Sequence, residues 1–492
     1  MPPMTSAVSR GCILPTMLRI PASNVSARAG NVHATRLRAT STAPAPRYSP
    51  SPTPVSPDTM PRVDPARMIA SELTYIRETL VNLLGSSHPA LTEIADYYFH
   101  LSGKQLRPQL VLLFSCATNG LASGFNERAL SPLNIQTGPK RFGLDMALSS
   151  PFVLNDWNPR MPDFTSSFVG PFDVHDRTSR SHNPPTQTSL STLSRPSPDT
   201  ILHAPPSATI LPTQLRLAQI TEMIHVASLL HDDVLDHAST RRSAPSAPSA
   251  FGNKLSVLGG DFLFGRASTA LARLGDNEVV ELVASVMSNL VEGEVMQMID
   301  NQKNSNGKSL KDDSSQSIPA APTQDTWTQY ICKSYFKTAS LMAKSVRASV
   351  VLGGAQLGDE QDEALKDVAY AYGRNLGIAF QLIDDALDFS SSTEIGKPGN
   401  GADLKLGLAT APVLFAWEEH PQMGALVVRR FEQEGDVELA RELVHRSNAL
   451  ARTHQLAKDY ASKALEALNL LPWTEARDAL VSLAGKAVDR AK

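Results

Sequence analysis

The sequence of 492 residues has few of the residues from which several common kinds of site are built. Its three cysteines, Cys12, Cys116 and Cys332, are too few and too widely spaced for a disulfide framework or a zinc site. Aromatic residues make up 6% of the chain, which is low for a β-sandwich and fits helices rich in Leu and Ala. A net charge of −3 argues against general nucleic-acid binding.

Long apolar runs and nucleophile motifs are also missing. The stretch from Leu341 to Leu357 is interrupted by Lys344 and Arg347, and no other run approaches the length of a membrane span. We therefore expect a soluble or peripheral protein. The sequence has no convincing Ser-His-Asp or Cys-His order, no Gly-x-Gly-x-x-Gly and no Walker loop, so it predicts neither covalent catalysis nor a nucleotide-binding loop.

Acidic residues are absent from the first 57 positions. This segment is rich in Ser, Ala, Thr and Pro and contains Arg10, Arg19, Arg28, Arg36, Arg38 and Arg47. Arginine without acid is typical of an organellar transit peptide. We expect residues 1–60 to be such a leader, and the alternative is a disordered tail with no targeting role.

Beyond the leader, apolar residues recur at helical spacing. Ile69, Leu73, Ile76, Leu80 and Leu83 form one apolar stripe, and similar patterns continue almost to the end of the chain. Alternating strand patterns are nearly absent. The sequence therefore predicts one all-α domain over residues 61–492. Two polar stretches, at 118–213 and 301–324, are expected to be inserts, the first of them disordered.

The pattern Asp-Asp-x-x-Asp occurs twice, at 232–236 after an apolar stretch and again at 384–388 after another. Residues four apart share a face of a helix, so Asp232 and Asp236 repel each other, as do Asp384 and Asp388, unless a cation lies between them. Mg²⁺ prefers such oxygen ligands and is often held jointly by carboxylates and a substrate's phosphates. The pair of motifs predicts a shared metal site, and a solvated acidic face is the alternative.

Several cations could bind an anionic substrate near these acids. Lys104 and Arg107 lie beside Gly103 and Pro108, where a helix is expected to begin, and Arg241-Arg242 follows the first motif. Each feature alone is as typical of a solvated surface. His225 alone on an apolar helix is more often a core residue than a ligand.

Taken together, these residues resemble the trans-prenyl diphosphate synthases from about residue 64 onward, apart from the two inserts. Further family landmarks are Gly259-Gly260-Asp261, Lys337-Thr338-Ala339, Gly396-Lys397-Pro398 and Gly401-Ala402-Asp403-Leu404. The resemblance implies an all-α isoprenoid-synthase bundle of long helices around a deep central cavity, with two or three Mg²⁺ ions and usually a homodimer. Two departures are Gln105, where the family has a second arginine, and Ser243, where Gly is customary.

The resemblance also implies roles for particular residues. The metal ligands would be Asp232, Asp233, Asp236, Asp384 and Asp388. The allylic diphosphate would contact Arg241, Lys337, Thr338, Gln381 and Lys397. Isopentenyl diphosphate would contact Lys104, Arg107, His225 and Arg242. The residues most directly involved in catalysis would be Asp232, Asp236, Asp384 and Lys337.

Ala227 and Ser228 lie about one helical turn before the first motif, where short-chain members of the family tend to place aromatic rings. Small side chains there predict a long polyprenyl product, although they also allow close helix packing. With the Arg-rich leader, a long product implies, by resemblance to the family, the mitochondrial matrix and the side chain of ubiquinone. Peripheral association with the inner membrane and a second, different subunit remain open.

Two alternatives share some of these features. A class I terpene cyclase has a similar cavity and a first Asp-Asp-x-x-Asp, but such enzymes usually replace the second motif and lack the Lys104 and Arg107 pair. A non-catalytic subunit of a heteromeric synthase typically loses the aspartates, and here both motifs are complete.

Overall fold

The computed structural model describes residues 63–85, 88–100, 105–135, 144, 147–148, 210–242, 244–302, 319–390 and 401–489. The chain divides into two units, Met1–Pro61 and Arg62–Lys492, and all the described residues belong to the second. The leader predicted at 1–60 therefore lies outside the described residues.

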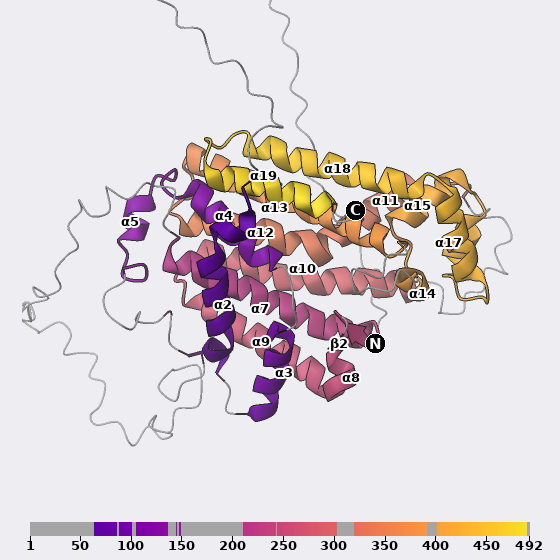
Figure 1. Cartoon of the computed structure of the whole chain (residues 1–492), viewed down its shortest axis with the longest axis horizontal. Coiled ribbons are helices and arrows are strands. Elements are labelled where there is room, and N and C mark those ends of the chain that lie inside the picture. Colours follow the sequence, from indigo (N-terminus) through magenta and orange to yellow (C-terminus); the bar gives the residue numbers. More distant parts are fainter. Residues whose placement is uncertain are drawn as a thin grey trace, which may run out of the picture. The chain divides into compact units, whose positions relative to one another are not determined.

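The described part of the chain is almost entirely helical, as predicted (Figure 1). The helices of the first half are α1 (Pro65–Met68), α2 (Ala70–Leu84), α3 (Pro89–His100), α4 (Leu106–Thr118), α5 (Phe125–Ala129), α7 (Pro212–Leu235), α8 (Ala247–Phe251) and α9 (Asn253–Ala272). Those of the second half are α10 (Asn277–Gln302), α11 (Gln324–Ser334), the π-helix η3 (Tyr335–Ala339), α12 (Ser340–Leu352), α13 (Glu360–Leu387), α14 (Ala402–Lys405), α15 (Ala411–Glu419), α16 (Met423–Val428), α17 (Asp436–Arg446), α18 (Ala449–Leu468) and α19 (Glu475–Val488).

Strand structure among the described residues is limited to one short pair. The two-residue strands β1 (Thr240–Arg241) and β2 (Ala244–Pro245) are antiparallel and follow the first aspartate motif directly. None of the described helices is both long and apolar enough to cross a bilayer.

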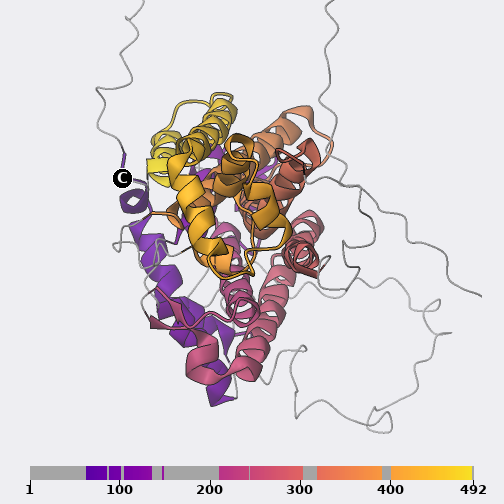
Figure 2. The same ribbon diagram turned by 90° about the vertical axis from the view of Figure 1, so that its right-hand side faces the viewer.

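Helices α7 and α13, which carry the two aspartate motifs, are central to the bundle. Helix α7 packs against α9, α4 and α12, and α13 packs against α18 and α12. A helix with neighbours on several sides must be apolar nearly all round, and Leu217, Ile220 and Ile224 of α7 are fully buried. Figure 2 shows the yellow C-terminal helices on the side of the bundle opposite the pink helices α7–α10.

Two glycines allow α13 to approach its neighbours closely. A Cβ atom at Gly377 would lie 2.5 Å from the Cα of Ala339, and one at Gly373 would lie 2.7 Å from the Cα of Ala343. Any larger residue would push α13 away from η3 and α12. These contacts fix the second aspartate motif relative to η3.

The first part of the predicted insert at 118–213 is ordered, so the expectation of disorder is wrong for residues 119–135. Helix α5 lies within it, and Arg128 Nη2 donates to Asp276 Oδ2 at 2.7 Å. Ser123 binds Asp362, and the buried Ala122 contributes to the core. The segment is mostly polar, so its sequence does not reveal these few contacts. Residues 149–209 of this insert and 303–318 of the second lie outside the described residues, and α10 continues to Gln302.

Candidate active site

Both aspartate motifs lie at the carboxyl ends of long helices. Helix α7 ends at Leu235 with Asp236 as its C-cap, and α13 ends at Leu387 with Asp388 as its C-cap. The carboxyl end of a helix carries a partial negative charge, which disfavours anions there and favours cations. The aspartates thus repel both each other and the helix end, so a cation stabilises this arrangement.

The first motif is part of a buried acidic cluster around one lysine. Lys337 Nζ lies 2.6 Å from Glu294 Oε1 and also donates to Gln297 Oε1 at 2.9 Å. Burial raises the pKa of Asp232 to about 7, and the charges of Glu294 and Asp236 act in the same direction. Burial lowers the pKa of Lys337, but Glu294, Asp232 and Asp236 outweigh it and raise the pKa overall.

Glu294 and Gln297 were not among the predicted site residues. They lie three apart on α10 and therefore share a helix face. The sequence feature that could have pointed to them is the neighbouring Gly293. A Cβ atom at this position would lie 2.9 Å from Cγ of Lys337, so a glycine is needed where α10 approaches η3.

The π-helix η3 connects the two motifs. Lys337 on η3 faces the acids of the first motif, while Thr338 Oγ1 donates to Gln381 Oε1 at 2.6 Å on α13. Gln381 Nε2 in turn donates to Asp385 Oδ1 at 2.7 Å. Single π-helical turns are rare and frequent at functional sites. Here the extra residue in the turn directs neighbouring side chains to two different helices.

The middle aspartates of the two motifs are both held by tyrosines. Tyr98 Oη donates to Asp233 Oδ2, and Tyr330 Oη donates to Asp385 Oδ2 at 2.6 Å. Burial raises the pKa of Asp385 to about 6, although the hydrogen bonds from Tyr330 and Gln381 oppose the shift. Both aspartates have less than 4% of their surface exposed, so the tyrosine hydrogen bonds satisfy buried carboxylates.

Two of the predicted metal ligands have other partners in the structure. Arg241 Nε lies 2.7 Å from Asp233 Oδ1 and 2.9 Å from Oδ2, so these two residues neutralise each other. Asp388 accepts hydrogen bonds from the backbone nitrogens of Ala402 and Asp403, both at 3.0 Å, at the start of α14. Metal binding by Asp233 and Asp388 and diphosphate binding by Arg241 stay predictions.

A pocket of about 300 Å³ next to the first motif contains two of the residues predicted for isopentenyl diphosphate, His225 and Arg242. Its lining includes His225, Arg242 and Glu222. Arg107 Nη1 donates to His225 Nε2 at 3.0 Å. Burial lowers the pKa of His225, as do the neighbouring arginine charges, so the imidazole is neutral and can accept this hydrogen bond. His225 therefore orients Arg107.

The other predicted residues have the following positions. Lys104 and Lys397 lie outside the described residues. Ala227 is fully buried in α7, and Ser228 Oγ donates to the His225 carbonyl at 2.9 Å. Asp384 lies in the last turn of α13, beside the Asp385 carboxylate.

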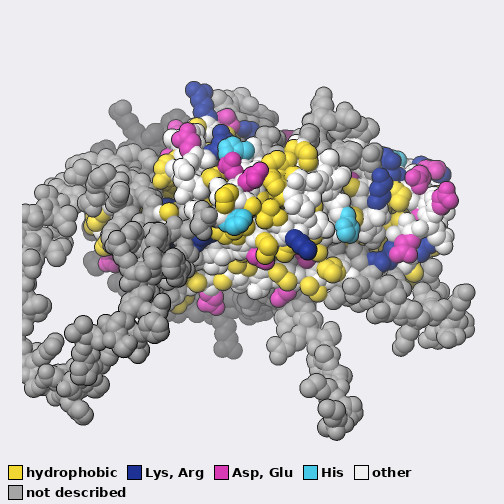
Figure 3. All heavy atoms as spheres, turned by 90° about the horizontal axis from the view of Figure 1, so that it is seen from below, with side chains coloured by type: hydrophobic (Ala, Val, Ile, Leu, Met, Phe, Trp, Pro, Cys, Tyr) yellow, Lys and Arg dark blue, Asp and Glu magenta, His cyan; other side chains and the backbone are white. Residues whose placement is uncertain are grey.

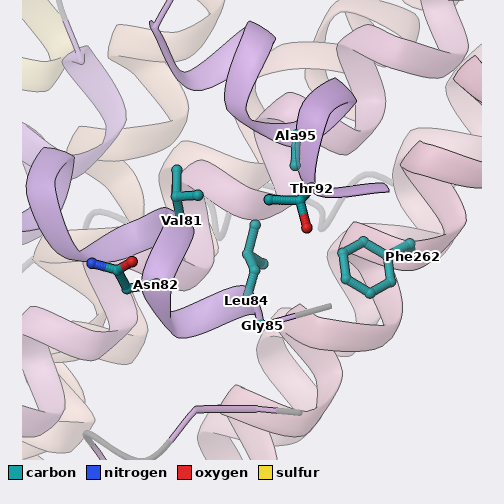
Figure 4. A pocket seen from close by; sticks show the side chains of 7 residues that line it. All are labelled: Val81, Asn82, Leu84, Gly85, Thr92, Ala95 and Phe262. Carbon is teal, nitrogen blue, oxygen red and sulfur yellow. The ribbon is translucent and has the colours of Figure 1, made fainter. Parts of the chain in front are cut away.

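Another pocket, of about 250 Å³, lies between α2, α3 and α9 (Figure 4). It is lined by Val81, Asn82, Leu84, Gly85, Thr92, Ala95 and Phe262. None of these residues is charged, so this pocket has no group suited to a diphosphate.

Comparison with known proteins agrees with this geometry. The family model for polyprenyl synthetase matches residues 200–444. The probable mitochondrial hexaprenyl pyrophosphate synthase of Neurospora crassa is 45% identical over 88% of this chain and 83% of its own length. Decaprenyl-diphosphate synthase subunit 1 of Schizosaccharomyces pombe is 39% identical over 87% of this chain and 91% of its own length.

Among solved structures, a polyprenyl synthase from Caulobacter crescentus, complexed with calcium and isoprenyl diphosphate, superimposes with a TM-score of 0.59. It is 26% identical and covers 87% of this chain and 97% of its own. The chain belongs to the polyprenyl synthetase family. It is a mitochondrial prenyltransferase of the long-chain polyprenyl diphosphate synthase type, so the predicted family, fold, enzyme class and localisation are confirmed.

Proposed function

We propose that the chain condenses isopentenyl diphosphate onto an allylic diphosphate and repeats this reaction to make a long all-trans polyprenyl diphosphate. The observation that carries the proposal is the acidic cluster of Asp232, Asp236 and Glu294 around Lys337. It lies next to a pocket lined by His225 and Arg242, and Arg107 donates to His225. The acidic cluster suits a diphosphate that binds through metal ions, and the pocket with its arginines suits a diphosphate without metal.

Asp232, Asp236 and Asp384 would hold two or three Mg²⁺ ions. Their donor atoms are all carboxylate oxygens, which is the ligand type that Mg²⁺ prefers. No three acidic, His or Cys side chains of the described residues are close enough to form a metal site by themselves. Mg²⁺ commonly takes its remaining ligands from water and substrate phosphates. When bound, it would stabilise the negative charge of the departing diphosphate.

The chain's own residues account for the other requirements of the reaction. Lys337 supplies a buried positive charge at the allylic diphosphate, where negative charge develops as the C–O bond breaks. Arg107 and Arg242, with Lys104, hold the isopentenyl diphosphate, and His225 keeps Arg107 oriented. The apolar residues in the pocket lining, Leu80, Val226 and Leu229, would limit the access of water to the allylic carbocation. The isopentenyl double bond attacks the cation, and the released diphosphate takes the proton.

The product is long because Ala227 and Ser228 leave the space beneath the aspartates open to the growing chain. The fungal relatives named for hexaprenyl and decaprenyl products support this assignment. A mitochondrial polyprenyl chain is suited to the ubiquinone side chain, made in the matrix and delivered to the inner membrane by a peripherally associated enzyme.

A homodimer is supported by exposed apolar side chains on two adjacent helices. On α10, Val291, Val295 and Met298 follow helical spacing and are 60%, 44% and 42% exposed, and on α9 Leu258 is 58% exposed. Figure 3 shows hydrophobic side chains gathered on the face seen from below Figure 1, where α3, α8 and α9 lie. Exposed apolar patches commonly mark protein interfaces. The subunit 1 relative suggests that a second subunit could also occupy such a surface.

The decisive experiment incubates the purified full-length chain with farnesyl diphosphate, radiolabelled isopentenyl diphosphate and Mg²⁺, followed by sizing of the dephosphorylated products. We expect an elongated series that ends at a long polyprenol. Absence of any extended product would overturn the single-subunit proposal, and a cyclic hydrocarbon would favour the cyclase alternative.

A further inference from the structure

The residue directly before the first aspartate motif is bound to a neighbouring helix. His231 Nε2 donates to the Val257 carbonyl of α9 at 3.1 Å and lies 3.4 Å from Asp261 Oδ1, one turn further along α9. The imidazole also packs against the ring of Phe264, with 5.6 Å between the ring centroids. We call the contacts of His231 with Val257 and Asp261 the histidine clasp. The clasp joins the carboxyl end of α7 to α9.

Gly260 provides the space that the imidazole occupies. A Cβ atom at Gly260 would collide with Nε2 of His231 and would lie 2.5 Å from its Cδ2, so any larger residue would displace the ring. Gly260 lies inside α9 and is not among the glycines with positive φ, so the requirement is for space and not for a special backbone conformation. The landmark Gly259-Gly260-Asp261 of the sequence thus surrounds a histidine of α7.

The last turn of α7 is held in three directions by three successive residues. Neighbouring residues of an α-helix point about 100° apart. His231 is bound to α9, the next residue, Asp232, lies in the acidic cluster with Lys337, and Asp233 is bonded to Arg241. The clasp therefore restricts the rotation of the turn that carries the first motif.

The acidic cluster opposes this arrangement. The charges of Asp236 and Glu294 repel that of Asp232, and the carboxyl end of the helix adds a partial negative charge. The last carbonyl groups of a helix also lack partners within it, so helix ends fray easily. A turn that rotates or frays relieves the repulsion but separates the carboxylates that a cation needs to find together. A hydrogen bond to the backbone of α9 opposes both movements.

We propose that His231 is a positioning residue for the metal site: the histidine clasp, with Gly260 beneath the ring, fixes the direction of the Asp232 and Asp236 carboxylates. This inference rests on the proposed function and deepens it. His231 does not bind the metal itself but acts through the two aspartates. Gly260 acts in turn through His231.

The test measures metal binding separately from turnover. Mn²⁺ serves as the probe, and the electron paramagnetic resonance signal of free Mn²⁺ gives its dissociation constant for the full-length chain. His231→Ala should raise this constant about tenfold, which is typical when a residue that orients metal ligands is lost. The Mg²⁺ concentration for half-maximal turnover should rise similarly. The KM for isopentenyl diphosphate should stay unchanged, because Arg107 and His225 lie away from the last turn of α7.

A conservative variant distinguishes positioning from simple packing. The amide nitrogen of His231→Gln can replace Nε2 as the donor to the Val257 carbonyl. His231→Gln should therefore restore Mn²⁺ binding to within about threefold of wild type. If it restores the melting temperature but not Mn²⁺ binding, the histidine clasp does not position the aspartates.

Gly260→Ala tests the same contact from α9. The added Cβ displaces the imidazole, so this substitution should weaken Mn²⁺ binding in the wild-type background but not in the His231→Ala background, where the ring is absent. Gly485→Ala is the matched control, because Gly485 lies inside α19 and a Cβ there would meet no atom within 4 Å. The control should bind Mn²⁺ as the wild type does.

The outcomes separate this inference from the proposed function. Unchanged Mn²⁺ binding in both His231→Ala and Gly260→Ala would overturn the positioning role. Equal losses from Gly260→Ala in the two backgrounds would also overturn it, because the glycine would then act independently of the ring. If His231→Ala does not fold, Gly260→Ala and His231→Gln decide. A wild-type chain that binds Mn²⁺ but makes no extended product would instead overturn the proposed function.

Discussion

At the scale of single residues, the three aspartates of each motif have different environments. Asp232 lies in an acidic cluster with a raised pKa, whereas Asp233 is bonded to Arg241 and Tyr98 and Asp388 holds the start of α14. The same residue type thus lies in a repulsive acidic cluster at one position and in stabilising hydrogen bonds at the next.

Substitution should separate these two roles. Asp232→Ala should reduce turnover to background without lowering the melting temperature, because it removes a buried carboxylate that repels Glu294. Asp233→Ala should lower the free energy of unfolding by about 3 kcal/mol, because it leaves the Arg241 guanidinium without its partner. Chemical denaturation and radiolabel incorporation measure the two effects. Equal loss of stability in both variants would contradict the distinction.

Chain length can be tested at one residue close to the aspartates. Ala227→Phe places a ring in the buried position five residues before Asp232 and should stop elongation after the first additions. Sizing of the polyprenols should show products much shorter than those of the wild type. An unchanged length would show that Ala227 does not face the product.

The sequence was sufficient to predict the helices but not all the partners of the site residues. The stripe through Leu73, Ile76 and Leu80 predicted α2 because burial of one helix face leaves a local pattern. The hydrogen-bond partners of Asp233 and Asp388, which are Tyr98 and the backbone of α14, could not be predicted because they are distant or unpatterned in the sequence. Tertiary contacts of this kind leave no periodic signal.

At the scale of elements, the ordered start of the insert depends on a carboxylate of α13. Asp362 accepts hydrogen bonds from the Ser123 nitrogen at 3.0 Å and the Gln356 nitrogen at 2.8 Å, and also from the Ser123 hydroxyl. Burial raises the pKa of Asp362, but these hydrogen bonds outweigh it and lower the pKa overall. The segment around Ser123 is rich in Ser and Asn, so its sequence did not predict these hydrogen bonds to Asp362.

The stability contributed by Asp362 should depend on pH. Its folded-state pKa is lowered, so its contribution is fully present above the unfolded pKa of about 4 and is lost as the pH falls through the folded value. Asp362→Asn should therefore lower the free energy of unfolding by about 2 kcal/mol at pH 7. The difference from wild type should shrink below pH 4 in urea denaturation. A difference independent of pH would contradict an ionic role.

At the scale of the whole molecule, the exposed apolar residues of α9 and α10 form the surface proposed for self-association. Replacing Leu258 and Val295 by Glu should place unpaired charges in the interface and give a monomer. Light scattering after size-exclusion chromatography measures the mass. Leu470→Glu is the matched control, because Leu470 is 77% exposed in the turn after α18, away from α9 and α10. A dimer that persists in the double variant would place the interface elsewhere.

The position of Lys337 also has a consequence for how the enzyme is loaded. Its ammonium group serves as an internal counterion for Glu294, Asp232 and Asp236. A divalent cation held by Asp232 and Asp236 would supply this neutralisation instead, and the ammonium group would then be available to an incoming diphosphate. We therefore expect metal and substrate each to strengthen the binding of the other, and both to bind more weakly as the salt concentration rises.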